Sequence, residues 1–251
     1  MHSYKKNDLY IKKSQNEIIL FIHGILASHV YFEPLIKLFI EKNYSIYAVN
    51  LKGHGENYKA LKNIKYHDWL NQIQQIIEKL SNKYPKVYII SHSLGTLLTL
   101  NSKNINKVTK AVLLAPALKT KVSLKSIKLA LKSHSQSVTD EYLVHHQKIS
   151  GIEFPSFFHK IYAIRPLIEL LKLIKLTKKQ LNSYKVDTII VMSKKDESVR
   201  FSSGQYVYSH IGSKQKELIV LNKSYHSLFD KDEEKDLYNR IIEFILSKNV
   251  E

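Results

Sequence analysis

One serine in this 251-residue chain has the surroundings that nucleophilic catalysis requires. Ser93 lies in ISHSLG, residues 90–95, between an apolar run that predicts a strand and an apolar run that predicts a helix. A serine at such a junction can be held in a strained turn if the positions two residues before and after it are small. Those positions hold Ser91 and Gly95, which fits the pattern G-x-S-x-G with serine in place of the first glycine. The segment therefore predicts a nucleophile at Ser93.

A histidine and a carboxylate must accompany such a serine, because its hydroxyl is a poor nucleophile at neutral pH. Where this turn occurs, the order along the chain is nucleophile, acid, histidine, each after the C-terminal end of a strand. Among the 12 histidines, His226 in NKSYHSLFD follows a predicted strand, whereas His210 falls in a predicted surface helix. Asp196 in VMSKKDESVR follows the preceding strand, and Glu197 is the alternative acid. We expect a triad of Ser93, Asp196 and His226.

The tetrahedral intermediate formed on a serine carries an oxyanion, which needs fixed N–H donors. We expect one donor to be the backbone N–H of Leu94, directly after the serine. The other should lie in the loop FIHGIL, residues 21–26, with Ile25 as first choice and Leu26 as second. His23 in this loop is expected to have a structural role.

Other kinds of site are poorly supported. KGHG, residues 52–55, lacks the spacing of a phosphate-binding loop and its following Ser or Thr. His145 and His146 are adjacent with no acidic or cysteine cluster, so we interpret them as solvated side chains and expect no metal site. No cofactor is expected, and no nucleic-acid-binding signature appears.

Six apolar runs recur at intervals typical of alternating strands and helices. They cover 17–22, 45–50, 86–91, 110–115, 187–192 and 217–221, and residues 8–12 are expected to add a short edge strand. Helical patterns cover 31–42, 67–83, 94–102, 202–210 and 232–247. The runs are apolar on both sides, as in parallel strands covered by helices. We therefore expect an α/β fold with a mostly parallel sheet and helices on both faces.

One interval breaks this alternation. About residues 118–184 contain no predicted strand and read as a helical cap insertion within a single domain spanning 1–251. The insertion should cover the edge of the sheet where Ser93 sits. Its apolar residues, with Phe157 and Phe158 among them, are then expected to line an acyl pocket together with Leu26.

Composition limits the setting and the partners. The formal net charge is +17, but lysines are scattered along the whole chain, so we expect at most weak association with anionic membranes. There is no cysteine, no run long enough to span a bilayer and no apolar signal core near residue 1. These features favour a cytoplasmic location, and the oligomeric state stays open.

The chain resembles serine hydrolases of the α/β-hydrolase fold, and more narrowly small bacterial carboxylesterases and monoacylglycerol lipase-like enzymes. The pieces that carry the resemblance are LFIHGILAS, NLKGHG with DWL, ISHSLGT, VMSKKDESV and SYHSLFDKDEEKDLYNRIIEFI. The sequence departs from the family pattern at Ser91, at Ser193 where glycine is common, and at Tyr225 before the histidine.

The resemblance implies hydrolysis of short-to-medium acyl esters or monoacylglycerols, with a small-molecule or lipid ester as substrate and no cofactor. An acyltransferase or thioesterase on the same triad is an alternative, because only the group that attacks the acyl-enzyme differs. A non-catalytic binding protein on a hydrolase scaffold is a further alternative, although such a protein would typically have lost one of the three residues.

Overall fold

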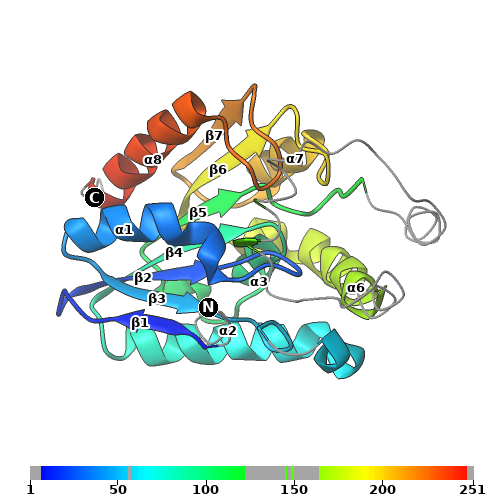
Figure 1. The fold of residues 1–251 in the computed structure, drawn as a ribbon, viewed down its shortest axis with the longest axis horizontal. Helices are drawn as coiled ribbons and strands as arrows, with labels where there is room; N and C mark the ends of the chain where they lie inside the picture. Colours follow the sequence, from blue (N-terminus) through cyan, green and yellow to red (C-terminus); the bar gives the residue numbers. More distant parts are fainter. Residues whose placement is uncertain (1–6, 56–57, 122–144, 146–147, 150–163, 248–251) are drawn as a thin grey trace.

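The computed structural model describes residues 7–55, 58–121, 145, 148–149 and 164–247. Its centre is a seven-stranded sheet with the order β1-β3-β2-β4-β5-β6-β7 (Figure 1). The strands are β1 (Leu9–Ile11), β2 (Glu17–Ile22), β3 (Ser45–Val49), β4 (Lys86–His92), β5 (Lys110–Leu114), β6 (Asp187–Ser193) and β7 (Lys216–Leu221). Strand β1 is antiparallel to β3, and every other pairing is parallel. The expected mostly parallel sheet is confirmed.

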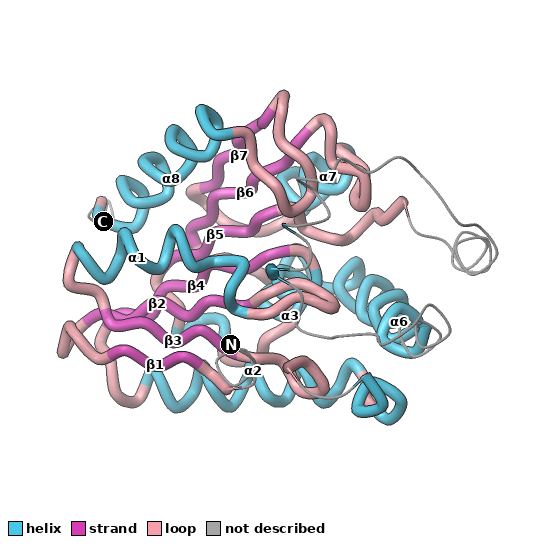
Figure 2. Tube along the Cα trace, viewed as in Figure 1, coloured by secondary structure: helices cyan, strands magenta, loops and turns pink. Residues whose placement is uncertain are grey.

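Helices cover both faces of the sheet (Figure 2). One face packs against α1 (Glu33–Glu41), which follows the short 3-10 helix η1 (His29–Phe32), and against α8 (Lys231–Leu246). The other face packs against α2 (Tyr66–Ser81), α3 (Leu94–Leu100), α6 (Ile164–Gln180) and α7 (Ser202–His210). Three further 3-10 helices are η2 (Tyr58–Asn63), η3 (Ile105–Lys107) and η5 (Leu181–Ser183). The central strands are buried on both faces, because each covering layer removes alternate side chains from water.

The described part of the expected 118–184 insertion includes α6. Polar bonds join α6 to the main body: Asn101 bonds to buried Thr177 and to Gln180, and the Glu169 carboxylate accepts the N–H of Tyr66, the first residue of α2. Phe157 and Phe158, expected in the acyl pocket, lie outside the described residues. Among the helices that the structure describes, none is long and apolar enough to cross a membrane.

The parallel arrangement places four loops at one edge of the sheet. Strands β2, β4, β6 and β7 run in the same direction, and their C-terminal ends lead into the loops that carry His23, Ser93, Asp196 and His226. Residues up to 203 positions apart in the chain therefore reach one place because of strand direction alone, as is usual for sites in open α/β sheets.

Candidate active site

The turn between β4 and α3 is sterically tight at Ser93. Its backbone has φ 52° and ψ −113°, a conformation that a non-glycine residue rarely adopts. A side chain at Gly95 would place its Cβ 2.3 Å from the carbonyl oxygen of Ile22. The helix can therefore approach β2 only with glycine at this position. This is the strained strand-to-helix turn that the sequence predicts around Ser93.

The small residues at two other positions serve the same approach. A Cβ on Gly24 would lie 2.9 Å from Nδ1 of His92 and 3.1 Å from Cβ of Ser93, so the loop after β2 comes directly against the serine. Ser91 is fully buried, and its hydroxyl faces the carbonyl oxygen of Val112 on β5 at 3.4 Å. A serine thus fits where the usual pattern has glycine.

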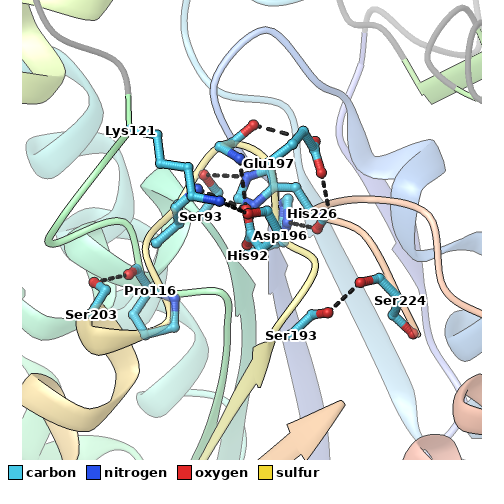
Figure 3. Close-up of polar contacts among 12 residues, drawn as sticks. His92, Ser93, Pro116, Lys121, Ser193, Asp196, Glu197, Ser203, Ser224 and His226 are labelled. Atoms are coloured by element: carbon cyan, nitrogen blue, oxygen red, sulfur yellow. Dashed lines mark hydrogen bonds and ion pairs between the residues drawn. The ribbon is translucent and has the colours of Figure 1, made fainter. Parts of the chain in front are cut away.

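The ring of His226 lies between a hydroxyl and a carboxylate (Figure 3). Its Nε2 is 3.1 Å from Oγ of Ser93, and its Nδ1 is 2.8 Å from Oδ2 of Asp196. The Asp196 side chain is 1 % exposed and the His226 side chain 11 %. Since the carboxylate can only accept, Nδ1 carries a proton in this pair, and Nε2 of neutral His226 is left to accept the proton of Ser93.

Asp196 is held by more than the histidine. Its second oxygen, Oδ1, accepts the backbone N–H groups of Ser198 at 2.8 Å and Val199 at 2.7 Å. Lys121, on the opposite side of the turn, donates from Nζ to the backbone carbonyl of Asp196. The alternative acid Glu197 does not contact the imidazole nitrogens in any described bond; instead its Oε2 accepts the backbone N–H of His226 at 3.0 Å.

A second carboxylate organises the loop that carries His226. Glu233 in α8 accepts the backbone N–H groups of residues 222, 223 and 224 and the hydroxyl of Ser224. Burial disfavours the charged form of Glu233 and by itself would raise its pKa. These hydrogen bonds have the larger combined effect, so the pKa of Glu233 is lowered. Asp230 caps the same helix by accepting the N–H groups of Asp232 and Glu233. The N-terminal turn of α8 thus builds the segment that precedes His226.

The two remaining departures from the family pattern are also accommodated. The hydroxyl of Ser193 donates to the carbonyl oxygen of Ser224, which ties the end of β6 to the histidine loop. Tyr225 is 42 % exposed, and its backbone N–H bonds to the carbonyl oxygen of Leu228 at 2.8 Å. Neither side chain intrudes between Ser93 and His226.

The loop after β2 distinguishes the two expected oxyanion donors. The N–H of Leu26 donates to Nε2 of His54 at 2.9 Å, and Leu26 has a left-handed φ of 60°. The Ala27 N–H closes the turn by bonding to the carbonyl oxygen of Gly24 at 3.3 Å. Because His54 occupies the Leu26 N–H, Ile25 is the donor of this loop better suited to an oxyanion.

Two buried neutral histidines hold this loop against the loop after β3. His54 Nε2 accepts from Leu26, and His23 Nε2 accepts the Leu51 N–H at 3.0 Å, so both nitrogens must be unprotonated. Burial lowers the pKa of His54 to about 4 and, together with the neighbouring His54, lowers the pKa of His23 well below its usual range. The expected structural role of His23 agrees with these contacts. The KGHG segment supplies His54 as the partner of the Leu26 N–H.

A short part of the insertion touches the loop that carries His226 and the loop after β2. Nε2 of His145 donates to the carbonyl oxygen of Ser227 at 2.7 Å, one residue after His226. The carbonyl oxygen of Ile149 accepts from the N–H and the hydroxyl of Ser28, at 2.9 and 3.0 Å. The expectation that His145 is merely solvated is wrong, because this part of the insertion folds back over the histidine loop. His146 lies outside the described residues.

Sequence reasoning located the three central residues but missed those that support them. His92, His54, His145 and Glu233 have no local pattern that announces their contacts. Glu197 was considered as the alternative acid, whereas in the structure it accepts the backbone N–H of His226. No group of three or more potential metal-ligating side chains occurs in the part of the chain that the structure describes.

Comparisons with known proteins identify the family of the chain. The family model named Hydrolase_4, described as serine aminopeptidase, S33, matches residues 13–234. The thermostable monoacylglycerol lipase of Bacillus sp. (strain H-257) is 23% identical over 212 residues, which cover 83% of this chain and 82% of that protein.

Solved structures share the fold over nearly the whole length. A structure reported with the metagenome-derived lipolytic enzymes LipS and LipT has a TM-score of 0.75 at 21% identity and covers 96% of this chain and 97% of its own. The monoacylglycerol lipase of Paleococcus ferrophilus has a TM-score of 0.72 at 16% identity and covers 95% and 97%. At these identities the likeness shows the α/β-hydrolase fold.

Proposed function

The chain belongs to the Hydrolase_4 family, serine aminopeptidase S33, as an ester-hydrolysing α/β-hydrolase, and we propose that it cleaves carboxylic esters through an acyl-enzyme on Ser93. The observation that carries this proposal is the ring of His226, which lies within hydrogen-bond distance of both the Ser93 hydroxyl and the buried Asp196 carboxylate.

In the first half of the reaction, Ser93 Oγ attacks the ester carbonyl carbon while Nε2 of His226 takes the hydroxyl proton. Asp196 stabilises the imidazolium that results. The oxyanion is bound by the N–H of Leu94, at the N-terminus of α3, and by the N–H of Ile25. Collapse of the intermediate breaks the bond to the alcohol oxygen, which receives the proton from His226.

In the second half, water replaces the alcohol. His226 takes a proton from the water as its oxygen attacks the acyl carbon, and the same oxyanion donors act again. Collapse breaks the bond to Ser93, whose Oγ recovers a proton from His226, and the carboxylic acid leaves. No residue outside this set and no cofactor is required for the proton balance.

The substrate class follows from the relative and from the insertion. A monoacylglycerol lipase is similar over most of the chain, and α6 of the insertion packs apolar residues against α3, the helix that begins directly after Ser93. We infer a preference for short-to-medium acyl esters, including monoacylglycerols, over acetate. Each buried CH₂ contributes about 0.8 kcal/mol, so kcat/KM should rise about fourfold per methylene until the acyl pocket is full.

Covalent labelling tests the nucleophile. A fluorophosphonate probe should modify the wild-type protein once, at Ser93, and should not modify Ser93→Ala. Ser91→Ala is the matched control, because it removes a buried hydroxyl two residues away and should still be labelled. Hydrolysis of p-nitrophenyl butyrate should fall by a factor on the order of 10⁴–10⁶ in Ser93→Ala. Labelling that persists in Ser93→Ala would overturn the assignment.

Chain-length dependence tests the substrate class separately. Rates on p-nitrophenyl acetate, butyrate, octanoate and palmitate should climb from acetate and then level off or decline. If acetate is the best substrate, the site has no acyl pocket, even when the labelling result stands.

A further inference from the structure

Two pairs of residues contact His226, and the two members of each pair are neighbours in the chain (Figure 3). In the pair 92–93, Ser93 contacts the ring and His92 contacts the backbone carbonyl; in the pair 196–197, Asp196 contacts the ring and Glu197 contacts the backbone N–H. We propose that His92 and Glu197 are positioning residues for the ester-cleaving reaction, acting through the backbone of His226. This inference rests on the proposed role of His226 as the general base.

Glu197 holds the N–H side of the peptide backbone. Its Oε2 lies 3.0 Å from the backbone nitrogen of His226, and a charged acceptor makes this bond stronger than one between neutral groups. Asp196 bonds to the ring from the adjacent position, so a single turn after β6 sets both the ring and the main chain of His226. Glu197 is exposed, which means that it can be replaced without opening the core.

His92 holds the carbonyl side. Its Nε2 lies 3.0 Å from the carbonyl oxygen of His226, and because a carbonyl can only accept, this nitrogen is the donor. The ring is 3 % exposed and stacks on Tyr31 with centroids 4.3 Å apart, so its direction is set by packing. His92 directly precedes Ser93 in the chain. Because His92 bonds to the main chain of His226 while Ser93 bonds to its ring, the two residues together set the 3.1 Å distance from Ser93 Oγ to His226 Nε2.

This closed arrangement has a kinetic consequence. Proton transfer from Ser93 depends on the distance and angle at His226 Nε2, and a misplacement of about 1 Å can lower a rate by about 10²-fold. If His92 and Glu197 set the main chain of His226, losing either bond should lower kcat while KM changes little, because both bonds reach the reacting atoms only through His226.

Two variants of Glu197 separate position from charge. Glu197→Gln and Glu197→Ala both remove the negative charge, but only the glutamine keeps an oxygen that can accept the His226 N–H. The other charged or titratable groups near the ring (Asp196, Lys121 and His92) are unchanged in both. We expect kcat on p-nitrophenyl butyrate to fall about 10- to 100-fold in Glu197→Ala and to stay within about threefold of wild type in Glu197→Gln.

The split between kcat and KM supplies the second readout. Because Glu197 acts through the main chain of His226, KM on p-nitrophenyl butyrate should change little in both Glu197 variants. Glu243→Ala, which removes an exposed carboxylate from α8, is the matched control and should change neither kcat nor KM.

An analogous pair tests His92. His92→Phe keeps a ring against Tyr31 but has no donor, whereas in His92→Gln the terminal amide nitrogen is as many bonds from Cβ as Nε2 of histidine. We expect a loss of kcat in His92→Phe that His92→Gln largely restores. His210→Phe, at an exposed position in α7, is the control. Thermal unfolding of each variant shows whether it folds, and should His92→Phe not fold, the Glu197 pair decides alone.

The outcomes distinguish this inference from the proposed function. Equal kcat values for Glu197→Ala and Glu197→Gln, or a wild-type kcat in Glu197→Ala, would overturn the positioning role while Ser93→Ala remained inactive and unlabelled. If Ser93→Ala itself stays active, the proposed function is wrong, and the positioning role that rests on it is wrong as well. The rate of fluorophosphonate labelling of Ser93, which also depends on His226, should follow kcat across the variants.

Discussion

The turn that carries Ser93 and the loop that carries His226 lie against each other but are held by different forces. The turn is shaped by close packing: Gly95 lies against Ile22, and Gly24 lies against Ser93, with no room for a side chain. The histidine loop is shaped by polar side chains from four other segments, among them Glu197, Glu233 and His92. Both kinds of constraint join segments that are far apart in the chain, but the turn is limited by atoms in direct contact, whereas the histidine loop is held by hydrogen bonds.

This contrast implies two kinds of failure. Changes in the turn should cost stability, because the backbone of a core helix must move. Changes in the histidine loop should cost turnover, because the base loses its orientation while the core stays packed. The following predictions sharpen or break that division.

Asp196→Asn should have the largest effect, and only on catalysis. The amide favours the tautomer of His226 whose proton is on Nε2, and this tautomer cannot accept the proton of Ser93. We expect kcat on p-nitrophenyl butyrate to fall about 10⁴-fold, which corresponds to an activation free energy higher by about 5.4 kcal/mol. Thermal unfolding should change by only a few degrees. A variant with near wild-type turnover would show that another group orients His226.

Gly95→Ala should have the next largest effect, and on stability. The added Cβ would lie 2.3 Å from the carbonyl oxygen of Ile22 and 2.9 Å from that of His23, both backbone atoms, so α3 must shift away from β2. We expect a loss of about 3 kcal/mol in the free energy of unfolding, measured in urea. Unchanged stability would mean that the turn is not sterically limited.

Acid should weaken the fold at the loop after β2. Burial lowers the pKa of His54 to about 4, below its reference value of 6.5. Between these values the unfolded chain binds a proton that the folded chain does not, so stability is fully present above pH 6.5 and is lost as the pH falls toward 4. His54 should contribute a loss of about 2 kcal/mol between pH 7 and pH 5.

The comparison for this effect is His54→Gln, in which the amide oxygen can still accept the Leu26 N–H but does not titrate. The free energy of unfolding of this variant should decrease less between pH 7 and pH 5 than that of the wild type, although His23 contributes in the same direction. Identical decreases in both proteins would contradict the assignment of a buried neutral imidazole at position 54.

Ser91→Gly should have the smallest effect. It restores the residue usual at this position, yet Ser91 is already accommodated against Val112. Glycine in a strand costs about 0.5–1 kcal/mol through conformational entropy. We expect a loss of that size in urea unfolding and turnover within about twofold of wild type; a large gain in turnover would show that serine distorts the turn.

The sequence by itself determined the fold class and the strands, and it predicted as a triad three residues that the structure brings together. Apolar runs of five or six residues predict buried parallel strands, and the observed bounds differ from the predicted ones by at most one residue at either end. Ser93, Asp196 and His226 could be chosen because each follows a strand end. Parallel strands bring such ends to one edge whatever the rest of the chain does.

Only the tertiary structure decided which side chains support that centre. Glu197 accepts the N–H of a residue 29 positions away, His54 accepts one 28 positions away, and His92 bonds to a carbonyl 134 positions away. Such bonds depend on the direction in which a loop presents its main chain, which no local spacing or periodicity encodes. His145 shows this most plainly: nothing beside it in the sequence indicates a partner, and its bond to Ser227 exists because the insertion returns across the histidine loop.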